Sequence, residues 1–142
     1  MPEDAKAIVD QWFTALNEGK SAALAAIENL YTPDYAVHYG SIGTVRGTAS
    51  IREQMESLFG GLSGLRFTVH DEMTQGDRVV TRYTFAGAHT ADLMGVPPSG
   101  RQVEGSAMCI SRVQNGKIVE VWAVFDSLNF LEQLRKPRAA SK

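Results

Sequence analysis

The stretch that decides the fold is Arg112-Val-Gln-Asn-Gly-Lys-Ile-Val-Glu-Val-Trp-Ala-Val-Phe-Asp126. Asn115-Gly116 lies between two runs rich in β-branched residues, and a type I′ turn needs the positive φ angles that these two residues adopt readily. The run from Lys117 to Phe125 is almost wholly apolar, so we expect a strand at the centre of a sheet. The stretch therefore predicts a β-hairpin whose second strand forms one wall of any functional site.

More strands are predicted before this hairpin. Alternation at period two predicts strands over residues 65–70, 78–89 and 101–113, and residues 35–39 resemble a short strand. A turn is expected at 75–77, and residues 91–100, which contain Pro97-Pro98, predict a loop. The expected inner face of the 78–89 strand is Val79, Thr81, Tyr83, Phe85 and His89.

Helical periodicity marks four other segments. Apolar residues at helical spacing predict helices over residues 3–18 and 127–135, and a second helix starting near Ser21. Ser50-x-x-Glu53 resembles a capping box that opens a third helix, which Gly60-Gly61 ends. The Gly-rich residues 40–47 are expected to be a connector. The expected inner face of the last helix is Leu128, Leu131 and Leu134.

Helices come first and a long meandering sheet comes last, which predicts an α+β fold with helices on one face of a curved antiparallel sheet. A sheet that curves around helices leaves a cavity for a small ligand. The chain has 142 residues, which predicts a single domain; we place it at residues 1–136, followed by a disordered tail at 137–142.

Composition excludes several partners and compartments. The formal net charge is −2 and the basic residues are scattered, so we expect no nucleic-acid partner. No apolar run is long enough for a membrane span, and the N-terminus does not resemble a signal peptide. A single cysteine, Cys109, fits a reducing compartment. We therefore expect a cytoplasmic protein without membrane association.

Motifs for cofactors and nucleophiles are missing from the sequence. It contains no Gly-x-Gly-x-x-Gly, Gly-x-Ser-x-Gly, His-Glu-x-x-His or paired-cysteine signature, so we expect neither a cofactor nor a metal. The three histidines, His38, His70 and His89, fall on different predicted strands. What remains is acid–base chemistry by His, Asp, Glu or Tyr in an apolar cavity.

Small side chains on two neighbouring strands mark the expected cavity. Cys109 and its neighbours at 105, 107 and 111 share one face, and Ala123 belongs to one face of the last strand. Large helix side chains, Trp12, Phe13 and Phe59, could instead fill this space. Cys109 itself could be a buried, inert thiol.

Three residues are candidates for acid–base work. Asp126 stands where the last strand enters the last helix, where it could be a carboxylate of raised pKa in the cavity or the N-cap of the helix. His38 lies beside Tyr35 and Tyr39, and His89 ends a strand at the long loop. Their type and position suggest pocket groups, although each histidine could also be structural.

Several segments together resemble a known family. They are Trp12-Phe-Thr-Ala-Leu-Asn-Glu-Gly-Lys20, Tyr31-Thr-Pro-Asp34, Gly76-Asp77-Arg78-Val79, Gly87-x-His89, Met94-Gly-Val-Pro-Pro-Ser-Gly-Arg101 and Arg112 to Trp122 with Asp126. With these segments the chain resembles the SnoaL-like polyketide cyclases of the nuclear-transport-factor-like superfamily, along nearly its whole length. The resemblance implies a cone-shaped fold with an internal pocket, cofactor-free acid–base chemistry and often a homodimer.

The resemblance also locates a departure from the family. In the family's aldol cyclases an aspartate deprotonates a carbon next to a carbonyl, and a histidine on the neighbouring strand assists. Those positions correspond here to Ala123 and Cys109, which cannot do the same work. The resemblance thus implies the fold, whereas the family's mechanism does not carry over.

Three functions remain open. The first is a cyclase or isomerase for a hydrophobic polyketide-like or terpenoid-like substrate, with His38, His89 and Asp126 as relocated catalytic groups or with catalysis by folding the substrate. The second is an epoxide-opening or hydrating enzyme, and the third is a non-catalytic binding module. The residues expected to contact the ligand are Trp12, Phe13, Tyr35, Tyr39, Met55, Phe59, Tyr83, Met94, Cys109, Val121 and Ala123. An apolar outward face with Ile118, Trp122 and Val124 suggests the dimer surface.

Overall fold

The computed structural model describes residues 4–40 and 43–136, so the expected tail at 137–142 lies outside the described residues. The helices are α1 (Ala5–Glu18), α2 (Lys20–Leu30), α3 (Ala49–Gly61) and α4 (Ser127–Arg135). The strands are β1 (Tyr31–His38), β2 (Thr44–Arg46), β3 (Leu62–Gln75), β4 (Arg78–His89), β5 (Gln102–Gln114) and β6 (Lys117–Phe125). The α+β class is confirmed.

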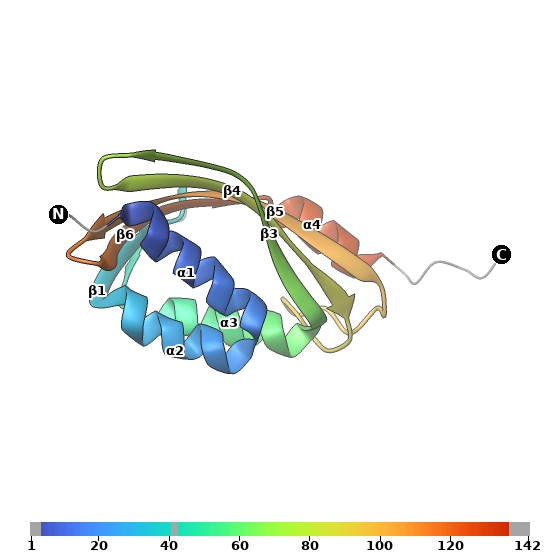
Figure 1. Cartoon of the computed structure of the whole chain (residues 1–142). Coiled ribbons are helices and arrows are strands. Elements are labelled where there is room, and N and C mark those ends of the chain that lie inside the picture. The colour runs from blue at the N-terminus through green and yellow to red at the C-terminus, as the bar shows by residue number, and fades with distance from the viewer. Residues whose placement is uncertain (1–3, 41–42, 137–142) are drawn as a thin grey trace.

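One curved sheet arches over α1, α2 and α3, and α4 lies beyond the arch beside β5 (Figure 1). The strand order is β2-β1-β6-β5-β4-β3. The expectation of a purely antiparallel sheet is wrong at one place, because β1 pairs with β6 in parallel. Side-chain alternation reveals which residues face the core but not the direction of the neighbouring strand, so the sequence did not disclose this pairing.

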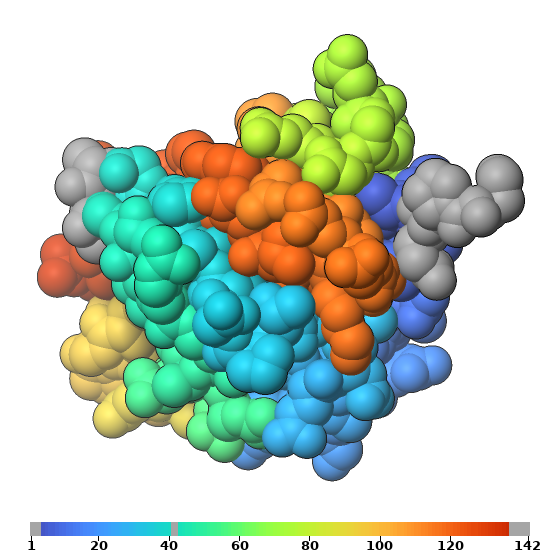
Figure 2. All heavy atoms as spheres, turned by 90° about the vertical axis from the view of Figure 1, so that its left-hand side faces the viewer, coloured from blue at the N-terminus to red at the C-terminus, as the bar shows by residue number. Residues whose placement is uncertain are grey.

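The β5–β6 hairpin matches the sequence prediction closely. Asn115 and Gly116 have φ angles of 53° and 74°, as the turn requires. β6 has hydrogen-bonded neighbours on both sides, β1 and β5, which places it inside the sheet. The hairpin between β3 and β4 is also present, and its tip projects from the body of the protein (yellow-green in Figure 2).

Element boundaries differ from the prediction mainly in the first half. β1 begins at Tyr31 and so includes Pro33, which has no backbone N–H to donate. The strand tolerates this proline because the β1–β6 register shifts between Tyr31 and Ala36, where the ladder does not need that donor. The short strand β2 lies in the predicted connector. Thr48, and not Ser50, is the N-cap residue of α3, and no side chain caps that helix. β3 has 14 residues and not the six predicted at 65–70, since it begins at Leu62 and continues along β4 to the turn.

A bulge reverses the expected faces at the start of β6. The β5–β6 register shifts between the pairs Arg112–Glu120 and Val113–Ile118, so Val119 is the extra residue. As a result Ile118 points into the core and is fully buried, whereas we expected it to face outward. Val124 is 69% exposed and does face outward. Because Ile118 does not, only part of the expected apolar outer face exists. The homodimer stays a prediction.

The inner face of α4 also differs from the sequence prediction. Leu128 is 70% exposed, whereas Phe130 and Leu134 are buried. Phe130 packs edge-on against Phe85, with ring centroids 5.3 Å apart. The Gln133 side chain donates to the Glu104 carbonyl and accepts from the Glu104 amide (2.7 and 2.9 Å), which fixes α4 along β5.

Asn17 fixes the other end of the core. Its side-chain amide donates to the Phe67 carbonyl (2.9 Å) and accepts from the Phe67 amide (2.7 Å). β3 is the outermost strand on this side, so Asn17 satisfies backbone groups that no further strand reaches. The contact holds the last turn of α1 against the sheet and thereby fixes the helix that carries Trp12 and Phe13.

Gly105 leaves room for the ring of Phe85 on the face of the sheet. It lies opposite Phe85 in the β4–β5 register, and the Phe85 ring covers it. A Cβ at position 105 would overlap this ring, approaching its Cε1 atom to 2.6 Å. The ring cannot retreat, because Phe67, Phe125 and Phe130 surround it.

We predict that Gly105→Ala lowers the free energy of unfolding by roughly 1–3 kcal/mol through overpacking. Gly60→Ala is the matched control: Gly60 is in α3, and a Cβ there meets nothing within 4 Å, so this change should be neutral or stabilising. Urea unfolding of both variants checks the prediction, and equal stability of the two would show that the Phe85 ring can move aside.

Candidate functional site

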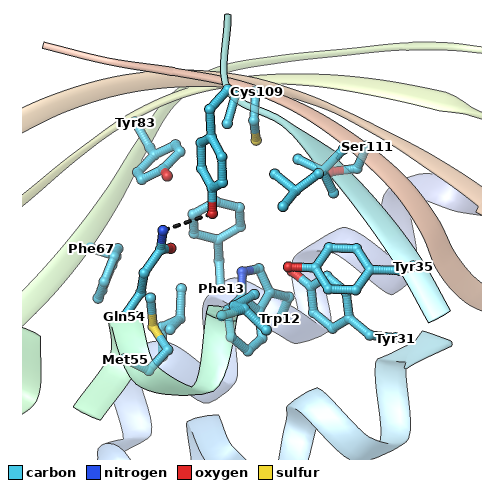
Figure 3. Close-up of a pocket in the computed structure, with 16 residues that line it drawn as sticks. Trp12, Phe13, Tyr31, Tyr35, Gln54, Met55, Phe67, Tyr83, Cys109 and Ser111 are labelled. Carbon is cyan, nitrogen blue, oxygen red and sulfur yellow. Dashed lines mark hydrogen bonds between the residues drawn. The ribbon is translucent and has the colours of Figure 1, made fainter. Parts of the chain in front are cut away.

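A pocket lies between the concave face of the sheet and the helices α1 and α3 (Figure 3). Aromatic and aliphatic side chains make up most of its lining. The lining residues are Trp12, Phe13, Leu16, Tyr31, Tyr35, Val37, Tyr39, Ile51, Gln54, Met55, Phe67, Tyr83, Cys109, Ser111, Val121 and Ala123. Its walls therefore come from both ends of the chain and from the middle.

The cavity is small, with a volume of about 90 Å³. For scale, an engineered apolar cavity of about 150 Å³ binds benzene. A ligand with two or more fused rings therefore needs side chains to move apart. Two lining residues with flexible side chains, Met55 and Gln54, belong to α3, in which the buried residues are Met55, Ile51 and Gly61.

Edge-to-face aromatic contacts build one side of the pocket. Tyr31 meets Trp12 with ring centroids 5.2 Å apart and Tyr35 with centroids 4.9 Å apart. On the other side Phe13 meets Tyr83 at 5.0 Å. Such pairs prefer this geometry because the positive ring edge faces the negative ring face. The α1 side chains thus orient the tyrosines whose hydroxyl groups border the cavity.

The buried polar groups of the pocket stay protonated at neutral pH. Burial raises the pKa of the Tyr31, Tyr35 and Tyr83 phenols above the usual value, since the charged form loses its solvation. Burial also raises the pKa of the Cys109 thiol to about 11. These groups can donate hydrogen bonds to a ligand oxygen, and none of them offers an ionised base.

One hydrogen bond crosses from α3 to the end of β1. The Gln54 side-chain amide donates to the Tyr39 hydroxyl at 2.7 Å, shown as a dashed line in Figure 3. Both residues line the pocket and both are partly or largely exposed to solvent. This bond therefore spans the side on which the pocket meets the surface.

The two positions at which the resemblance predicts a departure from the family pattern lie side by side. Cys109 and Ala123 are direct partners in the β5–β6 register, and both line the pocket. The prediction that small side chains on these strands leave space is consistent with this placement. Large helix residues fill part of the volume, as Trp12 and Phe13 contribute to the lining.

Asp126 does not line this pocket. Its carboxylate accepts a hydrogen bond from the Asn129 amide at 3.2 Å and so caps α4. It borders a separate, more open pocket of about 470 Å³, beside Ser106 and Met108. Of the two roles that the sequence left open, the geometry supports the helix cap.

His38 lies on the opposite face of β1 from Val37 and Tyr39. Its Nε2 donates to Glu120 at 2.7 Å, its Nδ1 is 2.7 Å from the Thr44 hydroxyl, and its ring stacks on Trp122 at 5.3 Å. The hydrogen bond from His38, supported by Arg112, holds the pKa of Glu120 below its usual value. This cluster ties the edge of the sheet together outside the pocket.

His89 is fully buried at the end of β4, also away from the pocket lining. The Ser99 amide donates to its Nδ1 at 3.2 Å, and the Ser99 hydroxyl is 3.0 Å from the same atom. The ring therefore holds the far end of the 90–101 loop. The three candidate catalytic residues are thus not brought together.

Most residues that the sequence nominated for ligand contact do line the pocket: Trp12, Phe13, Tyr35, Tyr39, Met55, Tyr83, Cys109, Val121 and Ala123. Phe59 packs at the margin of the core and Met94 is exposed, and neither side chain lines the pocket. Their role in binding stays a prediction. The sequence did not nominate Leu16, Tyr31, Val37, Ile51, Gln54, Phe67 and Ser111, although period-two and helical spacing from nominated neighbours could have found most of them.

No group of three or more His, Cys, Asp or Glu side chains in residues 4–40 and 43–136 could hold a metal ion. Within the same ranges, no helix has the length and apolarity needed to span a membrane.

We predict that Asp126→Ala costs about 1 kcal/mol of stability through loss of the helix cap, which corresponds to a melting temperature lower by roughly 3–5 °C. Asp126→Asn keeps an oxygen acceptor and should restore most of the loss. Ligand binding in the pocket should be unchanged in both. Thermal melting and a binding titration check this prediction. Loss of ligand binding by a variant with a normal melting temperature would show that Asp126 contributes to the binding site.

A second prediction concerns the Cys109 thiol. With its pKa near 11, the folded protein should react with iodoacetamide at pH 8 about tenfold or more slowly than the urea-unfolded protein, which carries more thiolate. Because the folded pKa exceeds the unfolded value, this group's contribution to stability is complete below pH 9 and is lost as the pH rises towards 11. Mass spectrometry follows the labelling, and equal rates would contradict the burial of the thiol.

Comparisons with known proteins give a consistent assignment. The family model described as SnoaL-like polyketide cyclase matches residues 6–134. No curated protein matches the chain. Among solved structures, AclR from Streptomyces galilaeus, for which a hydroxylase activity has been proposed, is similar with 28% identity, coverage of 92% of this chain and 94% of that chain, and a TM-score of 0.81.

Two further structures extend the comparison. IdmH from Streptomyces antibioticus, a proposed polyketide cyclase, shares 29% identity over 93% of this chain and 99% of its own, with a TM-score of 0.77. A proposed SnoaL-like polyketide cyclase from Jannaschia sp. CCS1 has 22% identity, coverage of 94% and 92%, and a TM-score of 0.82, which shows the shared fold. Since the family model covers nearly the entire chain, the protein belongs to the SnoaL-like polyketide cyclase family.

Proposed function

We propose that the protein cyclises or isomerises an uncharged, hydrophobic, polyketide-like molecule held in the internal pocket, without a cofactor. Membership of the cyclase family supports the general type of reaction. The observation that carries the specific proposal is the chemistry of the lining, in which neutral hydroxyl, thiol and amide groups border an aromatic cavity.

The neutral side chains that line the pocket in the described residues support an uncharged substrate. None of the lining side chains within the described residues is a carboxylate, an imidazole, an ammonium or a guanidinium group. A ligand carboxylate or phosphate buried here would lose its hydration without gaining a counter-ion, which is costly. Carbonyl and hydroxyl oxygens, in contrast, find donors in Tyr35, Tyr83 and Ser111.

These donors also suggest how the pocket accelerates a reaction. A phenol such as Tyr83 donates to a carbonyl oxygen and stabilises the negative charge that develops there when an enolate forms. The aromatic walls hold the chain of the substrate in a folded conformer, which brings reacting carbons together. Entry of the substrate requires that the bond between Gln54 and Tyr39 open, because the cavity is small in its present form.

A binding module for an apolar small molecule is the second candidate. It is favoured by the same neutral lining, since a pocket without an ionised acid or base is well suited to binding alone. Opening of an epoxide or hydration of a double bond is less well supported. Water must be activated by a base, and the lining formed by residues 4–40 and 43–136 contains no carboxylate or imidazole.

The test uses neighbouring residues on opposite faces of β6. We predict that Ala123→Phe fills the cavity and weakens the binding of a neutral bicyclic ketone, 2-tetralone, at least tenfold. Val124→Phe places the same side chain on the outer surface, where Val124 is 69% exposed, and should leave binding unchanged. Calorimetric titration measures both.

Equal affinity of the two variants, or no binding by the unaltered protein, would reject the pocket as the site. A panel of uncharged polyketide-like ketones, analysed for new ring products by mass spectrometry and NMR, then separates an enzyme from a binder. Binding without any product would favour the binding module.

A further inference from the structure

Tyr39 and Gln54 form a polar pair on the side of the pocket that meets solvent. Gln54 is exposed and Tyr39 is half-buried, whereas most of the other lining residues in the described chain are buried. The Gln54 side-chain amide donates a hydrogen bond of 2.7 Å to the Tyr39 hydroxyl. Beyond its role as a barrier to entry, this pair has the chemistry to bind a ligand that has entered.

Packing sets the positions of both side chains before any ligand arrives. Tyr39 follows directly on β1, two residues after Val37, which is buried in the same lining. Ile51 and Met55 of α3 are also buried lining residues, and Gln54 lies on the same helix face because it is three residues after Ile51. In Figure 3 the Gln54 side chain extends from α3 towards the concave face of the sheet.

The direction of the hydrogen bond determines what Tyr39 can offer. The Gln54 amide N–H donates, so the Tyr39 oxygen is the acceptor. A phenol that accepts one hydrogen bond keeps its own O–H for a second partner. Because linked hydrogen bonds polarise one another, a phenol that accepts from an amide is a stronger donor to the next oxygen. Gln54 therefore orients the Tyr39 hydroxyl and strengthens it as a donor.

We propose that Tyr39 donates a hydrogen bond to the carbonyl oxygen of the bound ligand and that Gln54 positions the Tyr39 hydroxyl for this contact. Tyr39 is then the residue that selects an oxygenated ligand over a hydrocarbon of the same shape, and Gln54 acts through it. The inference rests on the proposed function, since it assigns the group that holds the oxygen of the uncharged molecule.

This assignment also orients the ligand. Its carbonyl lies on the side where the pocket meets the surface, and its apolar part packs against the buried side chains of Phe13, Leu16 and Phe67. The bond between Gln54 and Tyr39 opens to admit the ligand and re-forms over it. The apolar body of the ligand then keeps water away from the Tyr39 hydroxyl, and a hydrogen bond shielded from water is stronger than an exposed one.

A purely structural role for the pair has different consequences. The ion pair between Arg52 and Glu28, 3.2 Å long, connects α3 to α2, and the bond from Gln54 to Tyr39 would be the corresponding connection from α3 to the end of β1. Its loss would then lower stability and weaken the binding of every ligand alike. The carbonyl would be bound by another phenol of the lining, such as Tyr83.

The test compares two probes, 2-tetralone and tetralin, which share a bicyclic skeleton and differ in the carbonyl oxygen. Calorimetric titration gives both dissociation constants, and the ratio of tetralin to ketone isolates the contribution of the oxygen. Tyr39→Phe keeps the ring and removes the hydroxyl. It should lower this ratio at least about fivefold and leave the affinity for tetralin unchanged. Tyr83→Phe should lower the ratio less.

Variants of Gln54 test the positioning role. Gln54→Met removes the amide at similar length and should lower the ratio about two- to threefold. Gln54→Glu introduces a carboxylate that is ionised at pH 7 and accepts the Tyr39 proton, so the ratio should fall as far as in Tyr39→Phe. The double variant Tyr39→Phe/Gln54→Met should fall no further than Tyr39→Phe alone, because Gln54 acts through Tyr39.

Gln75→Met is the matched control. It makes the same replacement on an exposed residue at the end of β3 and should leave both dissociation constants unchanged. Thermal melting of all variants reports stability separately. If Tyr39→Phe does not fold, the two Gln54 variants carry the test, and an unchanged ratio in both would contradict the inference.

The outcomes separate this inference from the proposed function. An unchanged ratio in Tyr39→Phe, a larger fall in Tyr83→Phe, or a higher ratio in Gln54→Glu would overturn the inference and leave the pocket as the ligand site. Equal weakening of both probes in the Tyr39 and Gln54 variants would also overturn it, because the pair would then only hold α3 in place. Failure of the unaltered protein to bind 2-tetralone would reject the proposed function as well.

Discussion

The position of β6 between β1 and β5 is the constraint on which the rest of the structure depends. It joins the first strand of the chain, in parallel, to the hairpin at its end. Without the β1–β6 pairing, Tyr35, Val37 and Tyr39 would not face Cys109 and Ala123, and no enclosed pocket would exist. The helices then bury the concave face, because a sheet that is apolar on one side must pack against something.

The same arrangement separates two chemical environments. On the outer face, the polar side chains of His38, Glu120 and Arg112 hydrogen-bond with one another near water. On the inner face, burial keeps phenols and the thiol protonated, so their value lies in donating hydrogen bonds. The described part of the chain thus forms a site whose lining is neutral.

The sequence predicted the parts of the fold that depend on local chemistry. The Asn115-Gly116 turn, β4 and β6, and the position of most pocket residues follow from turn preferences and from period-two alternation. It could not predict the direction of the β1–β6 pairing, the bulge that buries Ile118, or the exposure of Leu128, because each depends on contacts with residues far away in the chain.

In the candidate site, too, the predictions that depend on local alternation succeeded and those that depend on distant contacts did not. The sequence placed residues correctly in the pocket where the alternation of a strand determines which way a side chain faces, as for Tyr83 and Cys109. It misplaced residues that were chosen because of their chemical type. His38 and His89 attract notice as histidines, but their partners, Glu120 and Ser99, are revealed only by the fold.

The parallel pairing of β1 with β6 also has a consequence for how the protein acquires its shape. Tyr31 pairs with Ile118, so this contact closes a loop that contains most of the chain. Contacts between residues so distant in sequence form slowly, because much chain entropy is lost before they stabilise anything. During synthesis, β1 leaves the ribosome long before its neighbour exists and must wait with an unpaired edge. The pocket is therefore a late product of folding, and no amino-terminal fragment that stops short of β6 can contain it.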